Sequence, residues 1–256
     1  MGSALITGAT AGLGAAFVDA LATRGMDLVL VARDEARLQR EAARLRASGR
    51  VVEVLVADLA DRSDVDRVAS RLSDASAPIE LLVNNAGFGL HTRLTTGPAD
   101  LAELDRAIDV MARAVLVLSA AAGRAMRERG RGRTINVSST AGFVSMGTYS
   151  AIKAFVTTFT ESLANELHGT GVTVTALTPG WVHTEFHDRA GISKSKIPGP
   201  LWLDATFVAE QALHDADRGR VISNPSVRYK ALIWFARHLP RSAMRGVSRA
   251  LSGRRG

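Results

Sequence analysis

Tyr149 and Lys153 are spaced so that a phenol and an ammonium group could act together. The i,i+4 spacing puts both side chains on one face of a helix, one turn apart. The pKa of an ordinary tyrosine is about 10, and a nearby cation lowers it by favouring the phenolate. We therefore expect Tyr149 to give a proton to a substrate oxygen or to take one from it. Taken alone, this spacing also arises by chance on many helices.

A hydroxyl group that could share this chemistry stands ten positions earlier, at Ser139. It lies in the run Asn-Val-Ser-Ser-Thr-Ala-Gly of residues 136–142, at the end of a predicted strand. A serine there can donate a hydrogen bond to a carbonyl oxygen and polarise it. We expect a serine of this run and Tyr149 to meet at one substrate oxygen.

A glycine-rich loop, Thr-Gly-Ala-Thr-Ala-Gly-Leu-Gly, occupies residues 7–14. It follows a predicted strand and opens a predicted helix, so backbone N–H groups and the positive helix end would face a pyrophosphate. The spacing Gly-x-x-x-Gly-x-Gly is a weak signal by itself, and a plain turn is the alternative. We expect the loop to bind a dinucleotide through Gly8, Thr10, Gly12, Leu13 and Gly14.

Arg33, directly after the second predicted strand, bears on the choice of dinucleotide. An acidic residue at this strand end would bind a ribose 2′-hydroxyl, whereas arginine can clamp a 2′-phosphate. Ala32 stands where the acid would be expected. The sequence therefore favours NADP(H) over NAD(H), with a solvated charge as the alternative role for Arg33.

The elements that must position these groups alternate between short β-branched runs and longer helical patterns, which is typical of βαβ units. The expected strands are residues 4–7, 27–31, 51–56, 81–83, 134–137, 172–176 and, more weakly, 220–223; the expected helices are 13–24, 35–47, 63–72, 102–129 and 150–168. Right-handed crossovers place the loops after the strands along one sheet edge. We predict an α/β fold: a single-domain, Rossmann-type doubly wound parallel sheet with helices on both faces.

The glycine loop, an Asn-Asn-Ala-Gly run at residues 84–87, Ser139 and the Tyr-x-x-x-Lys pair occur in this order. Together they resemble the short-chain dehydrogenase/reductase family over about residues 3–223. The resemblance implies hydride transfer between a nicotinamide and a carbonyl or secondary alcohol. Ser139 would be the catalytic serine, with Ser138 as its small neighbour. Tyr149 would act as acid and base, and Lys153 would also hold the nicotinamide ribose.

The same resemblance assigns further cofactor contacts. Asp58 would accept a hydrogen bond from the adenine amino group, and Leu59 would donate its backbone N–H; an N-cap role for Asp58 or Asp61 is the alternative. The remaining contacts would be Asn85, Ala86 and Gly87 beside the ribose and Pro179, Gly180 and Thr184 at the nicotinamide carboxamide. Pro179 and Gly180 could also form only a turn.

Two features depart from the family pattern. Met111 stands where the family usually has an asparagine that supports a proton relay through water, and methionine cannot replace that amide. If the main chain holds the water, we expect a slower enzyme; otherwise the site is impaired. The Ser139–Tyr149 spacing is also about three residues shorter than usual, so residues 143–148 must turn tightly, aided by Gly147.

The composition excludes several classes of protein and of metal site. The 256 residues are 46% hydrophobic and 22% charged, which is ordinary for a globular enzyme, and the absence of cysteine excludes disulfides and thiolate metal sites. No cleavable signal or spanning segment is evident, so we expect a cytoplasmic protein. His91, His183 and His187 form no metal pattern, and we expect no metal.

The net charge of +7 is concentrated in residues 218–256, which hold ten Arg/Lys and no Asp/Glu, against 22 and 25 in residues 1–217. A basic tail on a neutral body argues against nucleic-acid binding. We divide the chain into a catalytic domain, 1–225, and a basic amphipathic extension of it, 226–256. The extension could contact anionic lipid, pack on a second subunit, or be a solvated face. By analogy, helices 102–129 and 150–168 suggest a homodimer or homotetramer.

Residues 185–203 mix apolar, aromatic and basic side chains and suggest a mobile substrate lid. Together with Phe88, His91 and Trp181, this segment indicates a largely apolar small-molecule substrate. A dinucleotide-binding regulatory or scaffold protein with weakened chemistry is the alternative function.

Overall fold

The computed structural model describes residues 2–90, 92, 94–95, 101–184, 199–238 and 246. Within these residues the strands form a seven-stranded parallel sheet of order β3-β2-β1-β4-β5-β6-β9. The strands are β1 (Ser3–Thr7), β2 (Asp27–Ala32), β3 (Val52–Val56), β4 (Ile79–Asn84), β5 (Gly132–Val137), β6 (Val172–Leu177) and β9 (Ile222–Ser223). This is the predicted doubly wound sheet.

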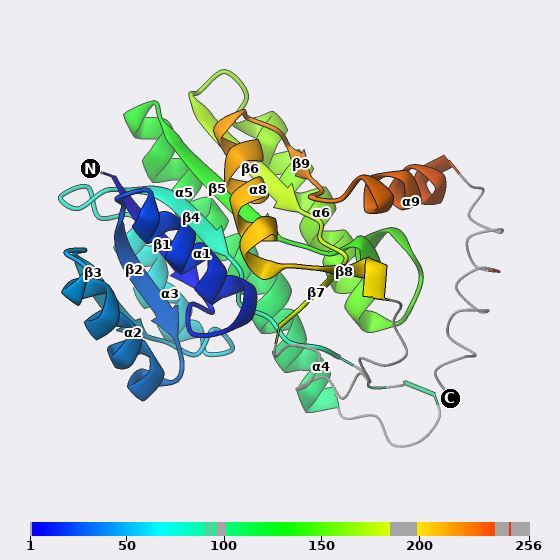
Figure 1. The fold of residues 1–256 in the computed structure, drawn as a ribbon, viewed down its shortest axis with the longest axis horizontal. Helices are drawn as coiled ribbons and strands as arrows, with labels where there is room; N and C mark the ends of the chain where they lie inside the picture. The colour runs from blue at the N-terminus through cyan, green and yellow to red at the C-terminus, as the bar shows by residue number, and fades with distance from the viewer. Residues whose placement is uncertain are drawn as a thin grey trace.

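Helices cover both faces of the sheet (Figure 1). They are α1 (Gly12–Thr23), α2 (Glu35–Ala47), α3 (Arg62–Leu72), α4 (Leu101–Ile108), α5 (Ala114–Arg129), α6 (Thr148–Glu166), α8 (Ala205–Asp217) and α9 (Val227–His238). Side chains alternate along each strand, so that Ile6 packs with α1, α2 and α8 while its neighbour Leu5 packs with α3 to α6. The two faces thus form two hydrophobic cores, as expected of a buried parallel sheet.

Some elements differ from the sequence prediction. The single helix expected over residues 102–129 is interrupted by a π-helical turn, η1 (Asp109–Arg113), which separates α4 from α5. Helix α8 and the two-stranded parallel pair β7 (Trp181–Val182) and β8 (Trp202–Leu203) were not predicted. These elements are stabilised by contacts between segments far apart in the sequence, and the local periodicity of the sequence does not indicate such contacts.

Helix α9 extends to one side of the sheet domain (Figure 1). Its side chains Tyr229 and Ile233 are buried, and α9 contacts the short 3₁₀ helix η2 (Thr140–Phe143). The chain segment that we assigned to a basic extension therefore begins with a helix packed on the catalytic body. The described part of the chain contains no helix that is long and apolar enough to cross a membrane.

Candidate active site

The predicted glycine loop is closed against the fourth strand by side-chain hydrogen bonds. Thr7 Oγ1 accepts from the backbone N–H groups of Asn85 and Ala86, each at 3.0 Å. Asn85 Nδ2 donates to the carbonyl oxygens of Thr7 at 3.0 Å and Gly8 at 3.2 Å. A Cβ on Gly14 would lie 2.0 Å from the Gly8 oxygen, so only glycine allows this closure. Asn85 thus holds the loop in shape through its side chain.

The loop leaves the start of α1 suited to an anion. The N-cap residue of α1 is Ala11, which supplies no side-chain cap, whereas α2, α3 and α8 are each capped by an aspartate. The first-turn N–H groups of α1 therefore receive no hydrogen bond from their N-cap side chain and can bind phosphate oxygens. A Cβ on Gly12 would lie 3.1 Å from Thr184 Cβ, so the loop and Thr184 adjoin the same space. These features fit a dinucleotide.

Asn84, the first residue of the Asn-Asn-Ala-Gly run, joins the centre of the sheet to two helices. Its amide donates to Asn136 Oδ1 at 2.9 Å and to Ser119 Oγ at 3.0 Å, and Asn136 donates to Thr160 Oγ1 at 3.1 Å. All four side chains are buried, where paired polar groups specify one arrangement of the strands. The network fixes the strand ends from which the catalytic candidates project.

Ser139, Tyr149 and Lys153 converge at the carboxyl end of β5. Ser139 is the N-cap of η2, and its hydroxyl accepts from Ala141 N at 3.1 Å and is hydrogen-bonded to Tyr149. Tyr149 lies in the first turn of α6. The N-cap of this helix is Gly147, whose φ of +83° lies in the left-handed region that favours glycine. The shortened loop therefore turns as predicted and keeps the two hydroxyls within hydrogen-bonding reach.

The Lys153 side chain is buried beneath Tyr149. Its Nζ donates to the Val137 carbonyl oxygen at 2.9 Å and lies 5.7 Å from the centre of the Tyr149 ring. The Ser138 hydroxyl donates to the Lys153 carbonyl at 2.8 Å and contacts Thr157 Oγ1 at 2.7 Å, which fastens α6 to β5. Ser138 and Thr157 are positioning residues that the sequence reasoning did not recognise, because small hydroxyl side chains are common in helices and strands.

Burial shifts the pKa of both Tyr149 and Lys153. Tyr149 is only partly buried as a residue, yet desolvation around it raises its pKa to about 12, against the opposite effect of the Ser139 hydrogen bond. Burial lowers the pKa of Lys153 to about 8. Lys153 Nζ donates to the Val137 carbonyl and lies over the Tyr149 ring, so burial has the larger effect on the phenol. The Tyr149 hydroxyl is therefore protonated at neutral pH.

Asp58 is held by an arginine that sequence reasoning missed. Arg106 Nη2 donates to both carboxylate oxygens of Asp58, at 2.9 and 2.8 Å, and Ala60 N donates at 3.1 Å. Burial acts to raise the pKa of Asp58, but Arg106, the Ala60 N–H and the charge of Arg33 together lower it. The N-cap of α3 is Asp61, so the N-cap interpretation holds for Asp61 and not for Asp58.

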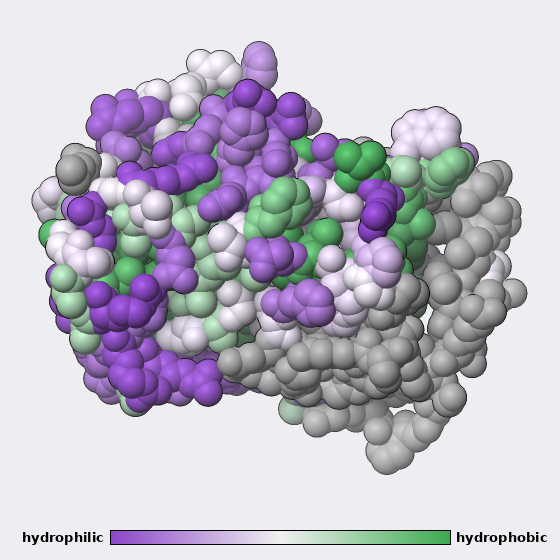
Figure 2. Space-filling view, viewed as in Figure 1, coloured by the Kyte–Doolittle hydropathy of each residue, from purple (hydrophilic) through white to green (hydrophobic). Residues whose placement is uncertain are grey.

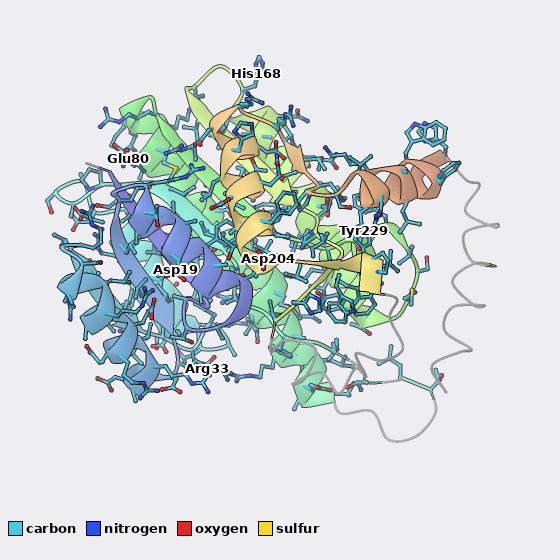
Figure 3. The ribbon with its side chains drawn as sticks, viewed as in Figure 1. Asp19, Arg33, Glu80, His168, Asp204 and Tyr229 are labelled. Atoms are coloured by element: carbon cyan, nitrogen blue, oxygen red, sulfur yellow. The ribbon has the colours of Figure 1, made fainter. Side chains whose placement is uncertain are left out.

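Arg33 is exposed at the end of β2, and in Figure 3 it lies at the edge of the sheet that carries the strand carboxyl ends. Its charge acts on Asp58, which places the two residues in one electrostatic environment. Leu59 contributes its side chain to the hydrophobic core. The structure therefore brings Arg33 near Asp58, two residues predicted to contact the cofactor, and pairs Asp58 with Arg106.

Met111 is buried within the π-helical turn η1. A Cβ on Gly87 would lie 3.2 Å from its sulfur atom, so Met111 fills the space beneath the Asn-Asn-Ala-Gly loop. Its side chain packs there as an apolar group.

The predicted nicotinamide segment is supported by α9. Pro179 O accepts from Thr140 N at 3.0 Å, which links the segment to η2. The Tyr229 hydroxyl accepts from Trp181 N at 3.2 Å and donates to Leu201 O at 2.8 Å; Figure 3 shows Tyr229 at the start of α9 beside the β7–β8 pair. The sequence analysis did not identify Tyr229, because no local pattern around it indicates these contacts.

Two aromatic rings and an imidazole form a wall beside this segment. His183 stacks on Trp202 with ring centres 4.5 Å apart, and Trp181 lies 6.1 Å from Trp202. The described residues contain no group of three His, Asp or Glu side chains that could hold a metal. His91 and most of the predicted lid, residues 185–198, lie outside the described residues.

Residues 3–194 match the family model described as short chain dehydrogenase. The chain belongs to this family. It is 33% identical over 217 residues to an uncharacterized oxidoreductase of Staphylococcus saprophyticus, a match that covers 82% of this chain and 92% of the relative. The protein is therefore an oxidoreductase of the short-chain dehydrogenase family, as the order of its motifs predicted.

Solved structures of this family hold either dinucleotide. A short-chain dehydrogenase from Sphingobium yanoikuyae in complex with NADPH is 35% identical, with a TM-score of 0.82 over 91% of this chain and 92% of that chain. A short chain dehydrogenase/reductase from Burkholderia phymatum in complex with NAD is 28% identical, with a TM-score of 0.78 over 91% of each chain.

Proposed function

We propose that this oxidoreductase uses NADP(H) to interconvert a carbonyl and a secondary alcohol on a largely apolar small molecule. The observation that carries the proposal is the hydrogen-bonded Ser139–Tyr149 pair above buried Lys153, at the sheet edge that bears the glycine loop. When bound, the nicotinamide supplies the hydride in reduction and accepts it in oxidation. The protein supplies the proton and the orientation of the substrate.

In the reducing direction, Tyr149 gives its phenolic proton to the substrate oxygen as the hydride reaches the carbon. The high pKa of Tyr149 keeps this proton in place until negative charge develops on the oxygen. The Ser139 hydroxyl is placed to donate a hydrogen bond to the same oxygen and stabilise that charge. Lys153 holds the nicotinamide ribose and provides a positive charge that stabilises the phenolate left behind.

NADP(H) is the proposed cofactor because Arg33 is exposed at the end of β2 and no acidic residue stands at Ala32. A guanidinium can make charge-assisted hydrogen bonds to a 2′-phosphate, whereas its hydrogen bond to an uncharged 2′-hydroxyl is weaker. The intact Ser139–Tyr149 pair disfavours the alternative of a regulatory or scaffold protein, since cofactor binding alone does not need either hydroxyl.

The test is NADPH oxidation, followed by absorbance, with a panel of aldehydes, ketones and quinones. We expect Tyr149→Phe to reduce turnover by about 10²- to 10⁴-fold, the range of general acid catalysis, with NADPH affinity unchanged. Ser139→Ala serves as a second variant and should also lower kcat. Equal turnover by the wild type and Tyr149→Phe would refute Tyr149 as the acid.

We also propose a cytoplasmic homodimer or homotetramer. Leu116 on α5 and Phe155 on α6 are 41% and 40% exposed, and Phe155 stacks on Phe159 with ring centres 5.9 Å apart. Large apolar side chains on adjoining helices support a subunit contact. Light scattering of the wild type and of Phe155→Glu tests this, and a wild-type monomer would contradict it.

A further inference from the structure

Helix α9 presents large apolar side chains to solvent. Leu232, Trp234 and Phe235 are 55%, 56% and 57% exposed, while Tyr229 and Ile233 on the other face are buried. Figure 2 shows apolar surface over α9, at the right of the view. Trp234 and Phe235 meet edge to face with ring centres 5.1 Å apart, so they form one continuous patch. Such a patch on a soluble fold marks an interaction surface.

The chain segment that carries this patch is basic in sequence. Arg228 and Lys230 are exposed on α9, and residues 218–256 contain ten Arg/Lys without any Asp/Glu. Residues 1–217, with 22 basic and 25 acidic side chains, are close to neutral. The apolar patch therefore belongs to the one strongly basic segment of the chain sequence. Trp, Phe and Leu next to Arg and Lys are the side chains with which peripheral helices bind an anionic bilayer.

We propose that α9 docks the protein on an anionic lipid surface. Leu232, Trp234 and Phe235 enter the boundary between headgroups and acyl chains, and the basic side chains contact the headgroups. A second copy of the chain fits this surface less well, because a two-fold contact sets the same basic segment against itself. An anionic bilayer offers the opposite charge and an apolar interior together.

Docking through α9 would set the active site close to the bilayer. Tyr229 of α9 contacts Trp181 and Leu201, and α9 packs on η2, which begins next to Ser139. This orientation rests on the proposed function: an apolar carbonyl or alcohol dissolved in the membrane would reach the substrate side of the site directly. The lipid contact itself requires no catalysis and is tested without it.

The experiment is co-sedimentation of the full chain with vesicles of phosphatidylcholine alone and of equal parts phosphatidylcholine and phosphatidylglycerol. We expect binding to the anionic vesicles that weakens as salt is added, and little binding to the neutral ones. Trp234→Ser/Phe235→Ser should reduce binding by at least about 10-fold, because it removes two large apolar anchors. Phe207→Ser, at a 48% exposed position on α8, is the matched control and should bind like the wild type.

Two further measurements complete the test. Arg228→Gln/Lys230→Gln should weaken binding to anionic vesicles and remove part of its salt dependence. Tyr149→Phe should bind vesicles as the wild type does, so a failure of catalysis is distinguished from a failure of docking. Absence of vesicle binding by the wild type, or equal binding by Trp234→Ser/Phe235→Ser, would overturn the proposal. Loss of an oligomer in that double variant, without vesicle binding, would assign the patch to a second copy.

Discussion

The ring of Tyr229 fills the space that a side chain on Gly180 would need. A Cβ on Gly180 would lie 1.9 Å from Tyr229 Cζ, a distance that no van der Waals contact allows. Gly180 follows β6 in the segment that we assign to the nicotinamide, whereas Tyr229 comes from α9. The C-terminal helix therefore packs directly on the segment predicted to contact the nicotinamide, although it lies beyond the predicted catalytic domain.

Gly180→Ala should consequently damage stability and cofactor binding together. The added methyl group must displace the buried Tyr229 ring, and overpacking of this kind costs about 1–3 kcal/mol. We expect a lower Tm and weaker NADPH binding, measured by thermal denaturation and fluorescence titration.

Tyr229→Ala provides the control for this contact. Combined with Gly180→Ala, it removes the ring that the methyl group strikes, so the double variant should lose less stability than the sum of the two single variants. Strict additivity would show that the two residues do not interact.

Arg33→Ala should weaken NADPH binding by about 10- to 100-fold and NADH binding little, because a hydrogen bond to a charged phosphate contributes about 1.5–3 kcal/mol. Dissociation constants for both cofactors are the measurement. Arg40→Ala, which removes the same charge from an exposed position on α2, is the matched control. The assignment of Arg33 to the 2′-phosphate fails if both affinities fall equally, or if the control behaves like Arg33→Ala.

The sheet and the order of the motifs could be predicted because both are local properties of the chain. Runs such as residues 28–31 are apolar throughout, and a strand buried on both faces has this pattern. Tyr149 and Lys153 likewise lie one turn apart by spacing alone. These local features were sufficient to predict the strand edge at which the candidate residues meet.

The contacts that tune the site were not predictable, because they join residues far apart in the sequence. Arg106 and Asp58 are 48 positions apart, and so are Trp181 and Tyr229. An arginine on a helix usually faces water, so nothing near Arg106 indicated its partner. The surroundings of Tyr149 were not predictable for a related reason: spacing shows that Lys153 is near, but not that the site is desolvated or that the ammonium donates to Val137 O.

The depressed pKa of Lys153 predicts how stability depends on pH. Burial lowers the pKa to about 8, whereas an unfolded lysine titrates near 10.4. Between these values the unfolded chain binds the additional proton, so the free energy of unfolding should rise as pH increases from about 8 to about 10.4. Below about pH 8 the charged lysine is present in both states and this gain is absent.

Denaturant unfolding of the wild type and of Lys153→Met at about pH 7 and about pH 9.5 measures this contribution. The wild type should gain stability relative to Lys153→Met at the higher pH. An unchanged difference between the two proteins at both pH values would contradict a depressed pKa.

Carbonyl reduction should also fall at alkaline pH, and Lys153 should set the limit. Tyr149, with a pKa of about 12, stays protonated far beyond neutrality, so it does not limit the rate first. Lys153 loses its charge above about pH 8. The neutral amine then binds the nicotinamide ribose less tightly and no longer stabilises the phenolate. The alkaline limb of kcat/KM should have an apparent pKa near 8 and should move upward in Lys153→Arg, whose guanidinium stays charged. An alkaline limb that does not move in this variant would assign it to another group.

Met111→Asn tests whether the apolar packing of Met111 beneath the Asn-Asn-Ala-Gly loop lowers the catalytic rate. Met111 is buried against Gly87, so an amide there loses apolar contacts and must find hydrogen-bond partners, which should cost about 2–4 kcal/mol of stability. The amide also supplies the donor and acceptor that methionine lacks, and with them a place for an ordered water. We therefore expect a lower Tm together with a several-fold higher kcat.

Met111→Leu keeps the volume and should cost less than about 1.5 kcal/mol without changing kcat. If Met111→Asn binds NADPH normally but gains no rate, the main chain already holds the relay water and Met111 serves packing alone.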